Sequence, residues 1–333
     1  MKRNEPIDIA VFGSGGWGKN LVRTFCSLVG EDHVVVIDPD RARLDAVAEQ
    51  HPGVATTATP DWEAVAAAVI AAPAALHRDL AQEALEHDLH VLIEKPIALK
   101  AADAKHLIAL ADERGRVLMV DHLLEYHPAV VRLKEMVDAG DLGRILHLTS
   151  RRLNLGVIRT EENALWSLAP HDISIVLFLL DQEPTTVSAH AATYLQPGIS
   201  DVAHVTMSFA DETMAHVHVS WLDPIKSRCL HVVGDNAMAV YDDMAADKLV
   251  VHQKAAVREG ERFVPKRAGE RAIEISDQEP LRAMGEAFLH SIRSGQAPPS
   301  DGYDGLRVVR ILEAAQASAD AGGSPVRMEG FHE

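Results

Sequence analysis

The sequence predicts an α/β protein with two domains: an N-terminal Rossmann domain on a doubly wound parallel sheet, and a C-terminal α+β domain with a mostly antiparallel sheet. Three observations support this. A glycine-rich turn follows the first apolar run, short apolar runs alternate with helical patterns to about residue 121, and strand-like alternation dominates after about residue 185. The 333 residues are enough for two cores, and we divide the chain into residues 1–123 and 124–333.

The glycine-rich turn lies between the apolar run at residues 7–12 and a helical pattern from about Asn20. Gly13, Gly15 and Gly18 form the pattern G-x-G-x-x-G. Such glycines allow a tight turn and bring backbone amides close to a pyrophosphate at a helix N-terminus. We expect the whole turn to contact a dinucleotide cofactor: Gly13, Ser14, Gly15, Gly16, Trp17 and Gly18.

Asp38 follows the second apolar run, residues 33–37, and lies twenty residues past Gly18. A carboxylate there can accept hydrogen bonds from the ribose hydroxyls of NAD and repels the 2′-phosphate of NADP. The sequence therefore favours NAD, while Arg41 and Arg43 keep NADP as the less favoured alternative. The turn also fits the first seven positions of the P-loop motif, G-x-x-x-x-G-K. At the next position, however, Asn20 replaces the Ser or Thr that would hold magnesium.

Further strands of the first domain are predicted at residues 68–72, 90–93 and 117–120, with helices at 39–50, 61–67, 77–86 and 101–114. In a doubly wound sheet the ligand lies beyond the carboxyl ends of the strands. Because Pro73, Lys95 and His122 each come just after one of these strands, we expect them to line the same crevice as Gly13 and Asp38.

The second domain has helical patterns at residues 128–139, 170–180, 281–294 and 303–321. Strands are predicted at residues 144–151, 202–209, 213–221, 228–233, 237–242 and 248–252. The highly charged segment 257–271 is predicted to be a mobile loop.

Composition excludes several classes of function. The net charge is −17, from 32 basic and 49 acidic residues, which argues against nucleic acid or an anionic membrane as a partner. Cys26 and Cys229 are the only cysteines, so we expect no disulfide framework, no thiolate metal site and a cytoplasmic location. We also expect no signal peptide and no membrane helix. His216 and His218 have the spacing of a metal pair, but nothing nearby completes a site, and we predict no metal.

Two side chains are candidates for proton transfer. Lys95, between Glu94 and Pro96, follows a strand that ends in the crevice, where an ammonium could hold a substrate hydroxyl and the nicotinamide ribose. The alternative is an ordinary lysine that pairs with Glu94. His171 titrates near neutrality and could take a hydroxyl proton. Asp172 could orient this imidazole or simply favour a helix N-terminus.

Residues 151–159 are a basic segment in an acidic chain. Arginine side chains suit phosphates or carboxylates, asparagine suits sugar hydroxyls, and tryptophan can stack on a ring. We therefore predict substrate contacts here and just beyond: Arg152, Asn154, Arg159, Asn163, Trp166 and Asp172. The alternative is a strand edge with solvated arginines.

With these residues in view, the chain resembles the Gfo/Idh/MocA oxidoreductases over nearly all of its length. It carries their glycine turn, Ala72-Pro73 followed by His77, Glu94-Lys95-Pro96, and a second-domain helix bearing His171. The resemblance implies a C-terminal domain with a large open-faced sheet, through which the chain forms a homodimer or homotetramer. It also implies cofactor contacts by Pro73, His77, Glu94, Lys95 and His122, with the catalytic pair Lys95 and His171 at the reacting carbon.

The residues RRLNLGVIR, ENALWSLAPHDIS, SWLDPIKSR and MAVYDD are similar to those of family members that act on nucleotide sugars. This implies NAD-dependent oxidation of a secondary hydroxyl, at C3, of UDP-N-acetylglucosamine or a close relative. One departure is Ser167, because the family often has Asp four residues before the histidine. Alternatives are a ketosugar reductase, an inositol or free-sugar dehydrogenase, and a non-catalytic NAD-binding sensor, which Ser167 alone supports.

Overall fold

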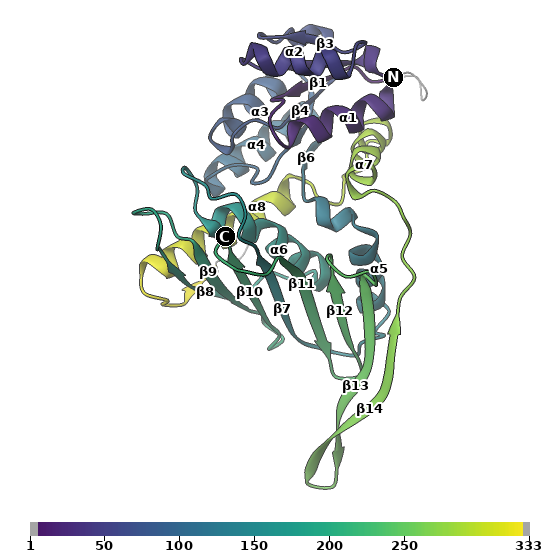
Figure 1. Ribbon diagram of the computed structural model, residues 1–333, viewed down its shortest axis with the longest axis vertical. Coiled ribbons are helices and arrows are strands. Elements are labelled where there is room, and N and C mark those ends of the chain that lie inside the picture. Colours follow the sequence, from purple (N-terminus) through teal and green to yellow (C-terminus); the bar gives the residue numbers. More distant parts are fainter. Residues whose placement is uncertain (1–5, 329–333) are drawn as a thin grey trace. The chain divides into compact units, whose positions relative to one another are not determined.

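The computed structural model describes residues 6–328. The chain divides into two compact units, each with its own sheet (Figure 1). The first contains the described residues up to Tyr126 together with Gln278–Arg310, and the second contains His127–Asp277 and the described residues from Ile311 on.

The first unit is built on a parallel sheet of six strands, in the order β3-β2-β1-β4-β5-β6 within the described chain. This is the Rossmann order, with the switch point between β1 and β4. Its strands are β1 (Ile9–Phe12), β2 (Val34–Ile37), β3 (Ala55–Thr57), β4 (Ala67–Ile70), β5 (His90–Ile93) and β6 (Leu118–Val120). Its first four helices are α1 (Gly18–Val29), α2 (Arg41–Gln50), α3 (His77–Glu86) and α4 (Ala101–Arg114). The parallel doubly wound sheet is thus confirmed.

Residues far along the chain complete this unit. Helix α7 (Pro280–Ser294) packs on α1, where Phe288 meets Phe25 edge to face with ring centroids 6.3 Å apart. Both phenylalanines are fully buried in the core that also contains β1 and β2. The predicted division at residue 123 gave this segment to the second domain, and that part of the prediction is wrong. The apolar face of α7 covers α1, a long-range contact that no local pattern reveals.

The second unit is built on a sheet of nine strands, in the order β14-β13-β12-β11-β7-β10-β9-β8-β15 among the described residues. Within the described part of the chain, only the β7–β10 pair of this sheet is parallel. The strands before the C-terminal hairpin are β7 (Ile145–Leu153), β8 (Thr186–Ala192), β9 (Val202–Ser208), β10 (Met214–Ser220), β11 (Ser227–Gly234) and β12 (Met238–Asp242). The edge strand β15 is Val326–Arg327. The mostly antiparallel sheet is confirmed.

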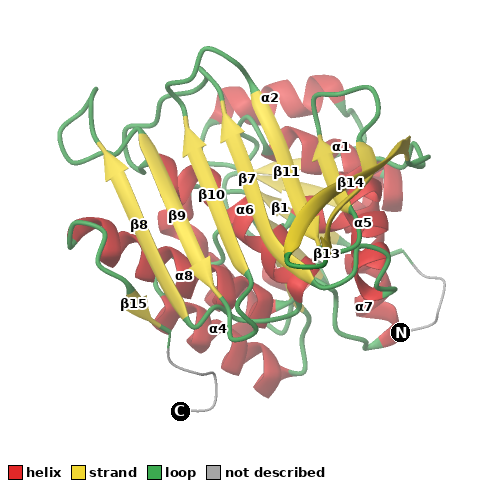
Figure 2. Ribbon diagram, turned by 90° about the horizontal axis from the view of Figure 1, so that it is seen from below, coloured by secondary structure: helices red, strands yellow, loops and turns green. Residues whose placement is uncertain are grey.

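Helices α5 (Pro128–Asp138) and α6 (Ala164–Leu180) cover one face of this sheet, and α8 (Gly302–Asp320) runs from the first unit into the second. Figure 2 views the opposite, open face. Side chains alternate between the two faces, so that Val205 and Val217 are buried on the helix side while His204 and His218 lie on the open side.

The open face is rich in histidine. His204 and His218 are directly paired across β9 and β10, and their rings stack with centroids 4.0 Å apart. Strand alternation puts seven histidines on this face: His147, His190, His204, His216, His218, His231 and His252. These imidazoles offer both donors and acceptors of hydrogen bonds when neutral.

Three local features complete the description. The segment 257–271, expected as a mobile loop, belongs to a hairpin of β13 (Leu249–Glu259) and β14 (Arg262–Ala272) that turns at Gly260, whose φ is +63°. Its charges are exposed strand side chains. The helix expected at 61–67 is only a short 3₁₀ turn, Trp62–Ala64, before β4. Among the residues that the structure describes, no helix is long and apolar enough to cross a membrane.

Candidate active site

The glycine-rich turn joins β1 to α1. Gly13 has a φ of +92°, and a Cβ there would lie 2.8 Å from the carbonyl oxygen of Ala71. A Cβ at Gly18 would lie 2.1 Å from the carbonyl oxygen of Gly13, so the fold itself requires these two glycines. Gly15 and Gly16 are different, because a Cβ would meet nothing closer than 3.6 Å at Gly15 and nothing within 4 Å at Gly16. They leave room for a ligand to approach the backbone.

The N-terminus of α1 suits a diphosphate. Trp17 occupies the N-cap position without a capping hydrogen bond from its side chain, and the first turn contains no acidic residue. The amides at this end therefore keep a favourable electrostatic field for an anion.

Asp38 follows the second strand of the sheet beside this turn and is only 2% exposed. Its carboxylate accepts hydrogen bonds from Ser14 N (2.8 Å), Ser14 Oγ (3.0 Å) and Asp40 N (2.9 Å). Burial alone would raise the pKa of Asp38, but these donors and the Arg43 guanidinium outweigh it and lower the pKa. An ionised carboxylate beside the glycine turn fits ribose hydroxyls and repels a 2′-phosphate.

Glu94, Lys95 and Asp121 lie at the carboxyl ends of β5 and β6. The Lys95 amide donates to Glu94 Oε2 at 3.2 Å, and the Trp17 indole donates to Asp121 Oδ2 at 3.1 Å. Asp121 therefore ties the end of β6 to the glycine turn. We did not single it out from the sequence, although its position one residue after a strand was a usable signal.

His77, predicted to contact the cofactor, lies at the start of α3 and is buried. Its Nδ1 is 2.7 Å from the carbonyl oxygen of Pro96, and its Nε2 is 2.9 Å from that of Ala72. The ring thus bridges the loops that follow β4 and β5. Pro73 begins the short turn Ala74–Leu76 in the first of these loops. This geometry gives His77 a structural role, and its contact with the cofactor stays a prediction.

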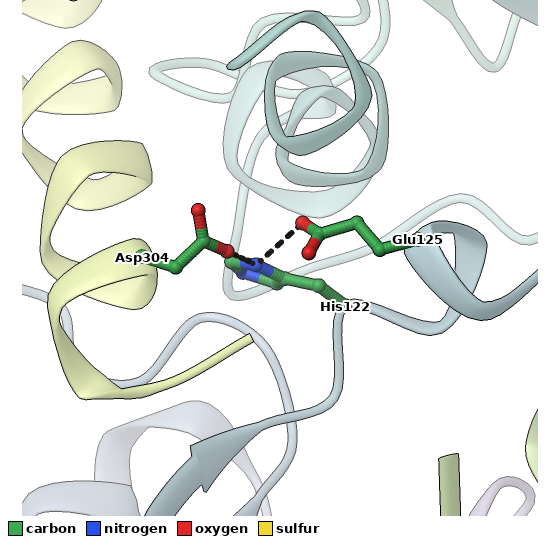
Figure 3. A group of neighbouring side chains, drawn as sticks. All are labelled: His122, Glu125 and Asp304. Atoms are coloured by element: carbon green, nitrogen blue, oxygen red, sulfur yellow. Dashed lines mark hydrogen bonds and ion pairs between the residues drawn. The ribbon is translucent and has the colours of Figure 1, made fainter. Parts of the chain in front are cut away.

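His122 was also predicted to line the crevice, and the structure contradicts this. It is 1% exposed, and its Nδ1 makes ion pairs with Glu125 Oε1 (3.3 Å) and with Asp304 of α8 (Figure 3). Burial would lower the pKa of His122, but the two carboxylates outweigh it and raise the pKa to about 10. Asp121 and His122 follow β6 in succession. The side chain of Asp121 contacts the glycine turn, whereas that of His122 points toward α8.

In the second unit, α6 carries the predicted general base. The helix begins at Ala164, not near Pro170 as expected, because Asn163 caps it by accepting a hydrogen bond from Trp166 N at 3.0 Å. Pro170 lies within the helix. Ser167 and His171 are four residues apart and therefore share one face of α6. The side chain of Asn163 also donates to Gln316 at 2.9 Å, so its polar atoms serve the fold.

Arg152 and Asp172, both predicted to bind substrate, bind each other. Arg152 Nε lies 2.6 Å from Asp172 Oδ2, with the two side chains 12% and 3% exposed. Ser150 Oγ donates to the other carboxylate oxygen. Asp172 therefore links α6 to β7. Because α6 begins at Ala164, Asp172 does not lie at the helix N-terminus, and that alternative is wrong.

Two further predicted contacts, Asn154 and Arg159, lie in the segment between β7 and α6, whereas Trp166 lies in the first turn of α6. Arg159 is half exposed, with its Nε 3.6 Å from Glu162 Oε1, and its carbonyl oxygen accepts a hydrogen bond from Gln196. Asn154 begins the segment, and its amide donates to the carbonyl oxygen of Ser220 at 3.1 Å. The segment is exposed, including Val157. Of the predicted arginines, Arg159 is the one with an exposed guanidinium.

The sheet has the strand order 3-2-1-4-5-6, and its first turn has open space beside Gly15 and Gly16. The helix N-terminus that follows has no side-chain cap, and Asp38 beside it is ionised. Together these features define an NAD-binding Rossmann domain. Two family models agree. Residues 7–122 match the oxidoreductase family with an NAD-binding Rossmann fold, and residues 130–240 match the Gfo/Idh/MocA C-terminal domain. The chain belongs to the Gfo/Idh/MocA family of oxidoreductases, and the P-loop interpretation is wrong.

Curated relatives span several substrates. The uncharacterised oxidoreductase YrbE of Bacillus subtilis is 25% identical over 98% of this chain and 97% of its own length. A UDP-N-acetylglucosamine 3-dehydrogenase of Acidithiobacillus ferrooxidans is 27% identical over 77% and 80%. Inositol 2-dehydrogenase 1 of Saccharopolyspora erythraea is 26% identical over 97% and 96%. This chain is accordingly an NAD(P)-dependent oxidoreductase that acts on CH–OH groups.

Solved structures share the fold. The Acidithiobacillus UDP-N-acetylglucosamine 3-dehydrogenase superposes with a TM-score of 0.82 at 24% identity, covering 95% of this chain and 98% of that one. A crystal structure from Magnetospirillum magnetotacticum, provisionally described as an oxidoreductase, has a TM-score of 0.80 at 30% identity over 93% and 99%. A levoglucosan dehydrogenase complexed with NADH has a TM-score of 0.83 at 19% identity over 98% and 100%. NAD is the cofactor.

Proposed function

We propose that the protein oxidises a secondary hydroxyl, at C3, of a nucleotide-linked sugar such as UDP-N-acetylglucosamine to the ketone. The observation that carries this proposal is the match to UDP-N-acetylglucosamine 3-dehydrogenase over 77% of the chain in sequence. The exposed Arg159 segment before α6 supports it, because a guanidinium can pair with a diphosphate.

In this reaction the sugar carbon loses a hydride and its hydroxyl loses a proton. NAD, when bound, accepts the hydride. We assign the proton to His171 and the holding of the hydroxyl oxygen to the ammonium of Lys95. With Ser167 on the same face of α6 as His171, no carboxylate stands four residues before the imidazole, so proton transfer relies on these two side chains.

Of the six residues predicted to bind substrate, we assign the role to those that do not hold the second unit together. Arg152, Asp172 and Asn163 take part in contacts within the second unit. We therefore place the diphosphate contact at Arg159, a sugar contact at Asn154 and ring stacking at Trp166, which is partly buried at the start of α6.

The second candidate is an inositol or free-sugar dehydrogenase, favoured by the match to inositol 2-dehydrogenase 1 over 97% of this chain. A ketosugar reductase would use the same residues in the reverse direction. A non-catalytic NAD-binding sensor rests on Ser167 alone.

The test is formation of reduced nicotinamide, measured by absorbance with NAD and a panel of UDP sugars, myo-inositol and glucose, in the presence of a ketone trap. Activity with one UDP sugar that His171→Ala abolishes supports the proposal. Arg159→Ala should raise KM for that sugar at least tenfold, whereas Arg258→Ala, an exposed arginine on β13, should not. Activity only with inositol or glucose favours the second candidate, and inactivity with intact NAD binding favours the reductase or the sensor.

We propose further that the chain forms a homodimer or homotetramer through the open face of the nine-stranded sheet. Neutral imidazoles can both donate and accept hydrogen bonds. This face can therefore form hydrogen bonds with the same face of a second copy that is related to it by a two-fold axis. A cytoplasmic location belongs to the same proposal, consistent with Cys26 and Cys229, which are buried and unpaired.

A further inference from the structure

Glu94 and Asp121 are held side by side by the parallel sheet. Ile93 and Val120 are register partners at the ends of β5 and β6, and the next residue on each strand is one of these acids. Backbone hydrogen bonds continue the sheet one residue further. Asp121 N donates to Ile93 O of β5 at 2.8 Å, and Glu94 N donates to Ile70 O of β4 at 2.9 Å. The proximity of the two carboxyl groups is therefore a property of the strand ends.

Each acid has one oxygen with a donor and one without. Glu94 Oε2 accepts from the Lys95 amide and Asp121 Oδ2 accepts from the Trp17 indole. Glu94 Oε1 and Asp121 Oδ1 are buried and receive no hydrogen bond from any described group. Two ionised carboxylates in this position would repel each other without compensation, whereas a proton between them satisfies both oxygens. Burial, and then Asp121, raise the pKa of Glu94, while Lys95 opposes them.

The neighbouring ionisable cluster differs, because cations lie beside its carboxyl groups. In it, His122 and Arg307 face the carboxyl groups of Glu125 and Asp304. Figure 3 shows how the imidazole lies between the two carboxylates. These cations favour the ionised form of Asp304, while burial and Asp304 raise the pKa of Glu125 to about 8. Beside Glu94, by contrast, the charged groups that shift its pKa are Asp121 and Lys95.

We propose that Glu94 and Asp121 share one proton, which the pair releases when NAD binds and holds when NADH binds. The pair lies at the carboxyl ends of two strands of the Rossmann sheet and is bonded to Trp17 of the glycine turn, the edge at which such sheets bind dinucleotides. The nicotinamide ring is cationic in NAD and neutral in NADH. A nearby cation favours the doubly ionised pair, and its loss restores the shared proton.

This inference rests on NAD as the cofactor and not on the identity of the sugar. Oxidation of the hydroxyl would pass one hydride to the nicotinamide, which would lose its positive charge, and one proton to His171. The pair could then take up one proton as His171 releases the substrate proton, so that the reaction frees no net proton before the cofactor is exchanged. That proton returns to solvent when NAD next replaces NADH.

Titration calorimetry tests the proposal with the whole chain and either NAD or NADH. Measuring the binding heat in buffers of different ionisation enthalpy counts the protons released. We expect NAD to release up to one proton and NADH to release none or nearly none. The affinity for NAD should correspondingly rise with pH, by at most about tenfold per pH unit for one proton.

Asp121→Asn is the matched variant, because its amide can donate to Glu94 Oε1 while its carbonyl accepts from Trp17. It should bind NADH nearly as wild type does and lose both the proton release and the pH dependence for NAD. Glu125→Gln, in the neighbouring cluster, should keep both. Absence of proton release in the wild type overturns the proposal, as does unchanged release in Asp121→Asn, which would place the proton elsewhere. Failure of the wild type to bind NAD at all would instead contradict the cofactor assignment.

Discussion

Arg152 of β7 and Asp172 of α6 form a buried ion pair, with Nε and Oδ2 2.6 Å apart, directly beside the residue that we assign as the general base. The pair fixes the turn of α6 that carries His171 against the sheet. The basic segment, in which we predicted substrate contacts, thus contributes one of its arginines, Arg152, to positioning.

Breaking this pair should cost stability. Arg152→Met leaves the buried Asp172 carboxylate with the Ser150 hydroxyl as its donor, and removing one partner of a buried pair typically costs about 3–5 kcal/mol. Arg152→Met/Asp172→Asn should recover more than half of that loss. Urea unfolding of both variants measures this. Wild-type stability in Arg152→Met, together with a raised KM for the sugar, would instead favour the predicted substrate contact.

Asp38 should decide the choice between NAD and NADP. Asp38→Asn removes the anion beside the glycine turn, and hydrogen bonds to charged groups contribute about 1.5–3 kcal/mol, so NAD should bind roughly tenfold to a hundredfold more weakly. The NAD/NADP preference should narrow, as dissociation constants for both cofactors would show. Asp40→Asn is the control. It alters the N-cap acceptor of α2, and should lower stability by at most about 1 kcal/mol without changing the preference.

Two glycines of one turn should behave differently. Gly18→Ala puts a Cβ 2.1 Å from a backbone carbonyl and should unfold or strongly destabilise the chain. Gly15→Ala meets no atom closer than 3.6 Å, and should keep the wild-type melting temperature while weakening NAD binding at least tenfold. Thermal melts and NAD titration together distinguish these outcomes. Unchanged NAD affinity in Gly15→Ala would show that the diphosphate does not approach this residue.

Stability should fall on the alkaline side because of His122. Its folded pKa is raised to about 10 from 6.5, so its contribution is complete below about pH 6.5 and is lost as the pH rises to about 10. Glu125, whose pKa burial and Asp304 raise to about 8 from 4.5, adds a loss of its own that accrues between those two pH values. Urea unfolding at pH 7, 9 and 10.5 should show the loss. His122→Gln should be less stable at pH 7 and should lose less stability between pH 7 and 10.5 than the wild type does.

The histidine face should make self-association sensitive to acid. Burial, followed by neighbouring charges that include Arg151, lowers the pKa of both His218 and His231 below 6.5, so these rings are neutral at pH 7. Protonation of these rings at acid pH would place like charges on both copies. Besides the histidines and Arg151, the face includes Asp242 and Glu270 as counter-charges. Analytical ultracentrifugation should show a dimer or larger assembly at pH 7.5 that dissociates at pH 5.5.

Gln variants separate this effect from a general loss of structure. His204→Gln/His218→Gln removes the stacked pair and should reduce the acid sensitivity. His106→Gln, exposed on α4 of the first unit, should leave it unchanged. Monomers at both pH values would contradict assembly through this face.

Local chemistry explains which features were predictable. Strand, glycine turn and Asp38 follow one another within the first 38 residues, and each has a short-range signature. The start of α6 was misplaced because Pro170 was taken as a helix start, although Asn163 supplies the cap seven residues earlier.

Long-range contacts account for the rest. His122 meets Asp304 across 182 residues, and Trp17 meets Asp121 across 104. Nothing in the local pattern around residue 122 distinguishes a side chain that faces a ligand from one that faces a distant helix. The hairpin of β13 and β14 was missed for a different reason, because its outward charges mask the strand alternation.

The chain passes between its two units at three places, after Tyr126, after Asp277 and after Arg310. The last passage lies within α8, so one continuous helix belongs to both units. A genetic crossover between two relatives at any point from residue 127 to 277 would therefore join the N-terminal Rossmann segment of one parent to the α7 of the other. Phe25 and Phe288 would then come from different lineages, which favours inheritance of the gene as a whole over exchange of separate modules.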